Sequence, residues 1–362
     1  MKAAVLEAYG QPLTVTDVDL AAPQEGEVKV AVRATGVCHS DLSIQQGKLP
    51  YPVPCVPGHE GAGEVLEVGP GVTAVRPGDR VVLMWQLMGG DCYYCRRGQP
   101  HLCDETRAMG LMDDGTSRLS RDGQLIFHGI NTACFAEQAV LREKALVKIP
   151  EDVPYEVAAV IGCGVLTGVG AAINTAKIRP GESVAVLGCG GVGINVVQGA
   201  RLAGANPIIA IDTVQTKLDM AQRFGATHIV DASDGGAVGR VMELTEGRGA
   251  DAAFEVVGAP ALQRQVFDMT RRGGRSVFVG AAGLTDEVSL PSLFLSLGEK
   301  NVLGCYYGSC DPKRDIPLFL DLWKAGRLDL EGLISQTSKL EDVNGAFEDM
   351  ESGKVIRTVL TP

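Results

Sequence analysis

The pattern of apolar and polar residues divides the chain near residue 180. Before this point, short apolar runs rich in β-branched residues alternate with Gly and Pro, as in Val28–Val32, Gly63–Val68 and Arg80–Leu83. Short runs of this kind, bounded by turn-forming residues, predict strands. We therefore expect an irregular, β-barrel-like domain in the first part of the chain.

From about Glu182 onward, short apolar runs alternate with amphipathic segments. Six strands are expected here: Ser183–Leu187, Ile208–Ile211, His228–Val230, Ala252–Val257, Ser276–Val279 and Val302–Tyr306. Helices are expected over Thr213–Phe224, closed by Gly225, and over Ala261–Arg272, closed by Gly273. Strands alternating with helices are typical of a doubly wound α/β domain with a parallel six-stranded sheet. The alternation ends after about Gly308.

Composition narrows the class of protein. A chain of 362 residues suggests two domains. The formal charge, 33 − 44 = −11, disfavours nucleic acid and anionic lipid as partners, so a small molecule is expected. The N-terminal segment lacks the apolar region and cleavage site of a signal peptide, which favours a cytoplasmic location.

The uncharged stretch Val157–Ala176 approaches the roughly 20 residues that cross a bilayer. Four glycines and several polar residues in it favour a buried segment, and no membrane association is expected. Ten cysteines without a secretory signal favour metal ligands and buried thiols over a disulfide framework.

A glycine-rich motif follows the first expected strand of the α/β region. Its residues are Gly188, Cys189, Gly190, Gly191, Val192 and Gly193, which fit G-x-G-x-x-G before a helix. Such a turn brings backbone N–H groups and a helix N-terminus to a pyrophosphate. Asp212 ends the next strand, 19 residues after Gly193, where a carboxylate binds the ribose hydroxyls of NAD and repels the phosphate of NADP. The alternative is that Asp212 only caps the next helix.

Three short segments carry thiol or imidazole groups: Gly36–Asp41, Gly58–Gly61 and Gly162–Gly164. Taken singly, each Cys or His is more often a buried or hydrogen-bonded structural residue. Together with the glycine motif and Asp212, in this order, they resemble the zinc-dependent medium-chain alcohol dehydrogenases over essentially the whole chain. The resemblance implies a GroES-like catalytic domain over residues 1–162, an NAD-binding Rossmann domain over 163–305, and a segment over 306–362 that completes the catalytic domain.

The resemblance implies that Cys38, His59 and Cys163 bind a catalytic zinc, with water or substrate in the fourth position. Two thiolates and one imidazole suit a tetrahedral zinc with an open site. Glu60 would be an alternative ligand, and Asp41 would act on His59 from behind.

The same resemblance assigns the remaining site residues. Ser40 would bind the alcohol oxygen and begin a proton relay. The NAD contacts would come from His39, Thr167, Gly188, Gly190, Gly191, Val192, Gly193, Asp212, Lys217, Val279 and Arg357. The substrate cleft would be lined by Leu49, Trp85, Gly129, Ile130 and Ala281. We expect Gly129 to leave space beside Trp85 for an aromatic ring or medium alkyl chain; alternatively, Gly129 only serves a turn.

Two positions depart from the family pattern. Ser43 stands where many members end the proton relay with a His, and a hydroxyl does not store a proton near neutral pH. The usual structural zinc is held by four Cys, but here the run offers Gly89, Cys92, Cys95 and Cys103. Asp91, His101 or Asp104 could supply a fourth ligand, and the alternative is three free thiols on a self-supporting lobe.

The expected function is NAD-dependent, zinc-dependent oxidation of a small primary alcohol to its aldehyde. One alternative is a thiol-adduct formaldehyde dehydrogenase of the glutathione or mycothiol type, whose acidic substrate requires a pocket with basic residues. The candidates for those basic residues are Arg107, Arg118 and Arg121. Another is a zinc-free binding or structural protein on the same fold. The resemblance suggests a homodimer, with edge pairing of the nucleotide-binding sheets, or a tetramer.

Overall fold

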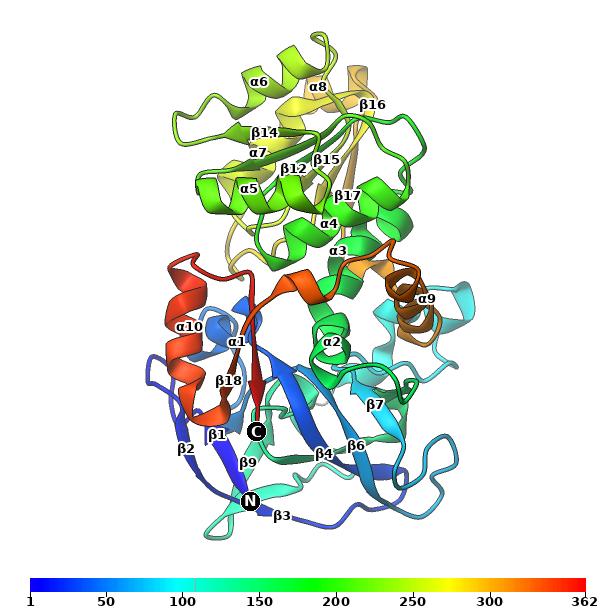
Figure 1. Ribbon diagram of the computed structural model, residues 1–362, viewed down its shortest axis with the longest axis vertical. Helices are drawn as coiled ribbons and strands as arrows, with labels where there is room; N and C mark the ends of the chain where they lie inside the picture. Colours follow the sequence, from blue (N-terminus) through cyan, green and yellow to red (C-terminus); the bar gives the residue numbers. More distant parts are fainter. Residues whose placement is uncertain (108) are drawn as a thin grey trace. The chain divides into compact units, whose positions relative to one another are not determined.

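A computed structural model describes residues 1–107 and 109–362. The chain divides into two compact units (Figure 1). The first unit comprises Met1–Cys163, Asp311–Leu320 and Leu330–Pro362, and the second comprises Gly164–Cys310 and Asp321–Asp329. The domain limits expected from the sequence follow the same order but place residues 163, 306–310 and 321–329 differently.

The largest sheet of the first unit has seven strands. The strand order is β11-β7-β6-β4-β19-β18, and β10 also pairs with β4. In that order, with β10 last, the strands are Leu146–Lys148, Arg80–Leu83, Glu60–Val68, Glu27–Gly36, Arg357–Thr361, Ile334–Lys339 and Gln138–Arg142. The three apolar runs noted in the sequence lie in β4, β6 and β7, as expected. Because β4 pairs with β6, β10 and β19, it is the strand that organises this unit.

Smaller sheets complete the β structure of the first unit. One pairs β1 (Lys2–Val5) with β2 (Thr14–Asp17), and another has the order β3-β8-β9-β5, with bounds Asp19–Leu20, Leu119–Arg121, Gln124–His128 and Cys55–Val56. The helices are α1 (His39–Gln45), α2 (Tyr155–Val160), α10 (Val343–Glu351) and the first part of α9 (Pro312–Lys324). The apolar side of α10 packs on the small sheets, where the rings of Phe347 and Phe135 are 6.2 Å apart.

The second unit contains a six-stranded, wholly parallel sheet in the order β14-β13-β12-β15-β16-β17. In chain order, β12 to β17 are Val184–Leu187, Ile208–Asp212, His228–Asp231, Ala250–Glu255, Thr270–Phe278 and Asn301–Gly304. The order reverses between β12 and β15, as in a doubly wound dinucleotide-binding fold. All six strands expected from the sequence are present.

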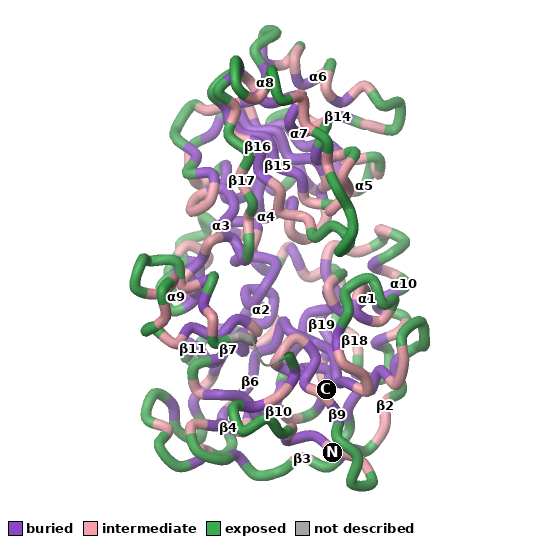
Figure 2. The backbone as a smooth tube through the Cα atoms, turned by 180° about the vertical axis from the view of Figure 1, so that it is seen from behind, coloured by how far each residue is buried: buried purple, intermediate pink, exposed green. Residues whose placement is uncertain are grey.

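Helices cover both faces of this sheet. Its helices are α3 (Leu166–Gly170), α4 (Gly191–Leu202), α5 (Gln215–Phe224), α6 (Ala237–Leu244), α7 (Pro260–Met269) and α8 (Ser292–Leu297). Val184 and Val186 face a core shared with α4 and α5, whereas Ala185 and Leu187 face one shared with α6 and α7. This is the alternation that a strand imposes on successive side chains. Figure 2 shows the buried strand β15 within the unit.

One helix boundary differs from the sequence-based expectation. The helix expected to run to Arg272 ends at Met269, because Thr270 already begins β16 and pairs with Ala250. Gly273 therefore lies inside a strand and does not close a helix. Gly225 does stand directly after α5, with φ of 121°, as expected for a glycine that ends a helix.

A long apolar helical segment runs over Tyr155–Thr175 and includes π-helical turns at Ile161–Val165 and Ala171–Thr175. It is long and apolar enough to cross a membrane by those criteria alone, yet 83% of its most apolar window is buried inside the protein. Burial of this extent is typical of a core helix, in agreement with the sequence-based interpretation.

Candidate active site

The zinc-ligand candidates come from three places in the first unit. Cys38 stands at the N-terminus of α1, two residues after β4, and His59 directly precedes β6. Glu60, the first residue of β6, pairs in register with Gly36, the last residue of β4, so the two strands bring these side chains together. Cys163 lies in the π-helical turn that follows α2, a distortion found frequently at functional sites.

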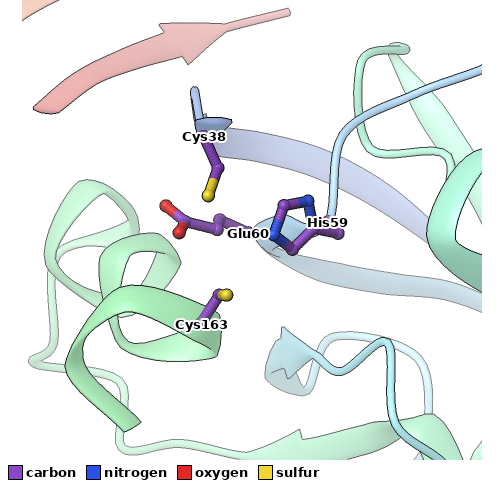
Figure 3. A group of neighbouring side chains, drawn as sticks. All are labelled: Cys38, His59, Glu60 and Cys163. Carbon is purple, nitrogen blue, oxygen red and sulfur yellow. The ribbon is translucent and has the colours of Figure 1, made fainter. Parts of the chain in front are cut away.

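These four side chains converge on one point (Figure 3). One ligand atom from each of Cys38, His59, Glu60 and Cys163 lies within 4.8 Å of all the others, and all four residues are buried. The three ligands predicted from the sequence are therefore brought together, and the Glu60 carboxylate lies within the same 4.8 Å limit.

Asp41 lies behind His59, as the resemblance implied. Its Oδ2 is 2.9 Å from His59 Nδ1, and its Oδ1 accepts a hydrogen bond of 2.9 Å from the backbone N–H of Gly58. Because Nδ1 faces Asp41, Nε2 is the nitrogen left for a metal. Burial acts to lower the pKa of His59, but Asp41 and Cys38 outweigh it and raise the pKa well above its usual value.

The donor set fits a divalent cation. The hydrogen bond from Cys163 holds the pKa of Cys38 well below its usual value, and the same bond raises the pKa of Cys163. Burial raises the pKa of Glu60 to about 7. Neither Glu60 carboxylate oxygen accepts a hydrogen bond from any described residue. Two thiols, an imidazole and a carboxylate buried this close together suit zinc, which binds S, N and O donors.

Arg357 contributes a positive charge to this site. It is buried, donates a 2.8 Å hydrogen bond to the carbonyl of Val37, and lies 3.4 Å from Glu60 Oε1. The resemblance assigned Arg357 to the NAD contacts, which stays a prediction, and within the first unit it interacts with Glu60 and Cys38. Gly36 makes room for this arrangement, because a Cβ at that position would collide with the Glu60 carboxylate.

The glycine motif of the second unit has the geometry of a phosphate-binding turn. Gly188 has φ of 99°, and a Cβ on Gly193 would collide with the Gly188 carbonyl, so both positions require glycine. A Cβ on Gly190 would meet no atom within 4 Å, which leaves its backbone open to a ligand. The motif opens α4 directly after β12, at the topological switch point of the sheet.

Asp212 ends β13 beside this motif. Its Oδ2 accepts a hydrogen bond of 2.7 Å from the N–H of Cys189, and its Oδ1 accepts bonds from Thr213 and Val214. The N-cap of α5 is Val214, so Asp212 is not the cap of that helix. The carboxylate is thereby oriented next to the glycine turn, where the sequence predicts the adenosine ribose.

Residues 24–151 match the family model of the alcohol dehydrogenase GroES-like domain, and residues 191–325 match that of the zinc-binding dehydrogenases. An S-(hydroxymethyl)glutathione dehydrogenase from Escherichia coli is 42% identical, over 99% of each chain. The crystal structure of an alcohol dehydrogenase zinc-binding domain protein from Burkholderia ambifaria superposes with a TM-score of 0.95 at 36% identity, covering 99% of this chain and 98% of that one. Benzyl alcohol dehydrogenase from Acinetobacter calcoaceticus does so with a TM-score of 0.94 at 33% identity and the same coverage.

This chain belongs to the zinc-dependent medium-chain alcohol dehydrogenases. Membership confirms the resemblance, the α/β fold class with its GroES-like domain, and the predicted cofactors, zinc and NAD. The dehydrogenase is therefore an oxidoreductase, and the zinc-free alternative is wrong. The individual roles of its site residues stay predictions.

The other residues predicted to contact NAD lie on different elements of the two units. His39 is exposed on α1 in the first unit, whereas Thr167 on α3, Lys217 on α5 and Val279 after β16 lie half-buried in the second unit. In the predicted proton relay, Ser40 Oγ is 3.9 Å from Cys38 Sγ, and the half-buried Ser43 follows one turn later on α1.

Trp85 forms an apolar wall beside the zinc ligands of the dehydrogenase. Its ring lies edge-on to that of His59, with centroids 6.4 Å apart. Leu49, predicted for the same cleft, is 42% exposed on the first unit, and Ala281 is exposed on the second.

The expectation for Gly129 is wrong. Gly129 is buried, and a Cβ there would lie 2.5 Å from the carbonyl oxygen of Val56 and 2.6 Å from Pro57 Cα. Its missing side chain therefore allows two backbone segments to approach and leaves no space for substrate. The alternative, that Gly129 serves a turn, describes the structure.

Sequence reasoning missed a hydrogen-bonded clamp behind this wall. Ile130, Asn131 and Ala133 have φ of 45°, 60° and 57°, a left-handed conformation that is costly for non-glycine residues. Tyr51 Oη donates to the carbonyl of His128 at 3.0 Å and accepts from the N–H of Asn131 at 3.2 Å.

Asn131 then connects the clamp to the wall, because its Nδ2 donates to the Trp85 carbonyl at 3.4 Å. The left-handed φ values are therefore held by hydrogen bonds from Tyr51 and Asn131. No residue spacing in the sequence signals the contact between Tyr51 and Asn131, which are 80 residues apart.

The second cysteine cluster lies on a lobe of short 3-10 turns. Cys92 Sγ is 3.5 Å from Cys95 Sγ and 3.8 Å from Cys103 Sγ. A hydrogen bond from the N–H of Cys95 lowers the pKa of Cys92 to about 7. Among the described residues, no fourth side chain shares the 4.8 Å group, and Asp91, His101 and Asp104 lie outside it.

Two of the three arginines considered for an acidic substrate are paired. Arg118 is buried and donates to Glu27, and Arg121 donates to Glu7. The side chain of Arg107 lies outside the described part of the structure.

Replacing Cys163 with Ala removes one of the three predicted ligands, so we expect kcat to fall at least about 100-fold and bound zinc to be lost. NADH binding, measured by fluorescence, should persist because the glycine motif lies in the second unit. Cys55→Ala, another fully buried cysteine, is the matched control and should retain zinc. A Cys163→Ala protein with native zinc content and turnover would contradict the ligand assignment.

Replacing Tyr51 with Phe keeps the ring but removes the hydroxyl of the clamp. We expect kcat/KM for benzyl alcohol to fall roughly fivefold, equivalent to about 1 kcal/mol, with unchanged zinc content, because the hydrogen bonds of the hydroxyl to His128 and Asn131 are lost. The ratio of benzyl alcohol to ethanol kcat/KM should fall as well, because Trp85 loses support. Tyr93→Phe, on an exposed tyrosine, is the control. An unchanged substrate ratio would show that the clamp does not position the wall.

Proposed function

We propose that this dehydrogenase oxidises primary alcohols bearing an aromatic ring or a medium-length alkyl chain to aldehydes with NAD, and catalyses the reverse reaction. The observation that carries the proposal is the buried Cys38–His59–Cys163 centre beside the apolar ring of Trp85. The likeness to a benzyl alcohol dehydrogenase over 99% of the chain supports the substrate class.

In this proposal, Cys38, His59 and Cys163 hold the zinc and Glu60 is the fourth protein group within reach. When bound, zinc supplies Lewis-acid polarisation that makes an alcohol more acidic. Asp41 fixes the tautomer and direction of the His59 ring through the 2.9 Å contact at Nδ1.

Ser40 carries the first proton step. Its hydroxyl, next to Cys38 on the first turn of α1, accepts the proton of the alcohol O–H and donates its own onward to solvent. NAD, which the glycine motif and Asp212 would hold, would supply the acceptor for the hydride of the carbon that bears the oxygen. Alcohol and NAD⁺ thus give aldehyde, NADH and one proton, and the chain contributes alignment and exclusion of water.

A second function is oxidation of S-(hydroxymethyl)glutathione. The observation in its favour is the 42% identity to E. coli proteins of that name. Against it, the glutathione carboxylates require unpaired basic groups, whereas Arg118 and Arg121 are engaged by Glu27 and Glu7. We therefore rank this function second.

We also propose a cytoplasmic homodimer. β17 is the edge of the six-stranded sheet, and α8 beside it exposes Leu293, Phe294 and Leu297 to 63%, 64% and 67%. An unpaired edge strand and exposed apolar side chains favour pairing with a second copy. Sedimentation of the purified protein at the mass of a single chain would contradict this assembly.

Kinetics over an alcohol series tests the proposed substrate class. We expect kcat/KM with NAD to rise at least about tenfold from ethanol to benzyl alcohol or hexanol, because each buried methylene adds about 0.8 kcal/mol. Trp85→Ala should reduce this ratio while leaving zinc bound.

Formaldehyde, assayed with and without glutathione, distinguishes the second function. A rate that depends on glutathione and exceeds that with benzyl alcohol would favour the adduct reaction. Equal kcat/KM for ethanol and benzyl alcohol, without glutathione dependence, would contradict both substrate assignments and leave the zinc centre untouched.

Asp212 is expected to make NAD the preferred cofactor by about 100-fold, because a carboxylate disfavours the phosphate of NADP. Asp212→Asn keeps an oxygen that can accept from Cys189 but removes the charge, so the ratio of kcat/KM for NAD and NADP should narrow. Asp219→Asn, on the exposed side of α5, is the control. Equal use of both cofactors by the unmodified protein would exclude this role.

A further inference from the structure

The cysteine lobe offers three thiols where the family's structural zinc has four ligands. Gly89 precedes Cys92 by three residues, as Cys92 precedes Cys95, so Gly89 occupies the place of the first ligand. Its N–H lies 3.4 Å from Cys103 Sγ, which puts position 89 beside the sulfurs.

The space of the absent side chain is filled from elsewhere in the chain. A Cβ built on Gly89 would coincide with the carboxylate of Glu105, with Oε1 the nearest atom. The other oxygen, Oε2, accepts a hydrogen bond of 2.9 Å from Lys144 Nζ. Glu105 therefore places an anionic oxygen donor where a ligand at position 89 would be.

We infer that Glu105 replaces the missing thiol and is the fourth ligand of a zinc held by Cys92, Cys95 and Cys103. Zinc accepts carboxylate oxygen as well as thiolate sulfur, and a structural site requires four protein ligands. Oε1 would bind the metal while Lys144 holds Oε2, an orientation by a neighbouring charge that is common at metal sites.

The three sulfurs are already gathered, whereas Glu105 lies outside their 4.8 Å group. Binding therefore requires a side-chain rotation toward the metal, which three flexible torsions and the half-exposed position of Glu105 allow. Lys144 offsets part of the negative charge that three thiolates and a carboxylate place around one Zn²⁺.

His101 is the competing donor on this lobe. It is 9% exposed, and its Nδ1 has no hydrogen-bond partner among the described residues. Unlike Glu105, it does not occupy the side-chain position of Gly89. A His101 variant therefore separates the two assignments.

The test measures zinc per chain and its release to a chelator in the intact enzyme. The unmodified protein should contain two zinc ions, and Cys163→Ala should retain only the lobe zinc. In that background, Glu105→Gln should release this zinc at least about tenfold faster. Glu67→Gln, on an exposed glutamate paired with Lys29, and His101→Asn should not.

A rescue variant tests the equivalence of the two positions. Gly89→Cys combined with Glu105→Ala rebuilds a four-thiol set and should restore slow release, with folding monitored by circular dichroism. The inference is overturned if the unmodified protein binds one zinc, if His101→Asn and not Glu105→Gln labilises the lobe zinc, or if the double variant stays as labile as Glu105→Ala.

Discussion

Burial of several ionisable groups around one point is the constraint on which the active site depends. Cys38, His59, Glu60 and Cys163 share a space in which every ligand atom is within 4.8 Å of the others. Anionic groups removed from water at this spacing repel one another, and Arg357, which lies 3.4 Å from Glu60 Oε1 and also interacts with Cys38 and Cys163, offsets part of this repulsion. A divalent cation would offset the rest when the ligands are deprotonated.

The scaffold meets this constraint by close approach of backbones. Pairing of Gly36 with Glu60 joins β4 to β6, and the absence of a Cβ at Gly36 leaves the room that the Glu60 carboxylate takes. Gly58, with φ of 93°, faces the backbone of Phe135 and donates to Asp41. The same principle operates in the second unit, where Gly193 lies against the Gly188 carbonyl. Glycine at these positions fixes geometry that no side chain would permit.

Much of the second unit could be predicted from the sequence, because its strands are continuous apolar runs and its glycine motif is local. The zinc set could be predicted only through a resemblance, since Cys163 lies more than 100 residues from His59. Gly129 shows the limit of such reasoning. The sequence shows that a glycine has no side chain, but it does not show which atoms lie where that side chain would be. The contact between Tyr51 and Asn131 and that between Glu105 and Gly89 each join different segments of the chain. No periodicity or spacing in the sequence marks either contact.

The two cysteine clusters differ in what holds them. The catalytic set is positioned by strand register and a buried helical segment. The lobe is built from the 3-10 turns Cys95–Arg97, Pro100–Leu102 and Asp104–Arg107, and Cys92 and Cys95 are only half-buried. Short turns of this kind bury little apolar surface, and their hydrogen bonds are exposed to water. Metal binding there would add directly to the stability of the local fold, whereas at the catalytic centre it serves chemistry. A flexible carboxylate such as Glu105, the ligand that we infer for the lobe, would suffice there, whereas the catalytic centre requires ligands that strand register and a buried helix hold in place.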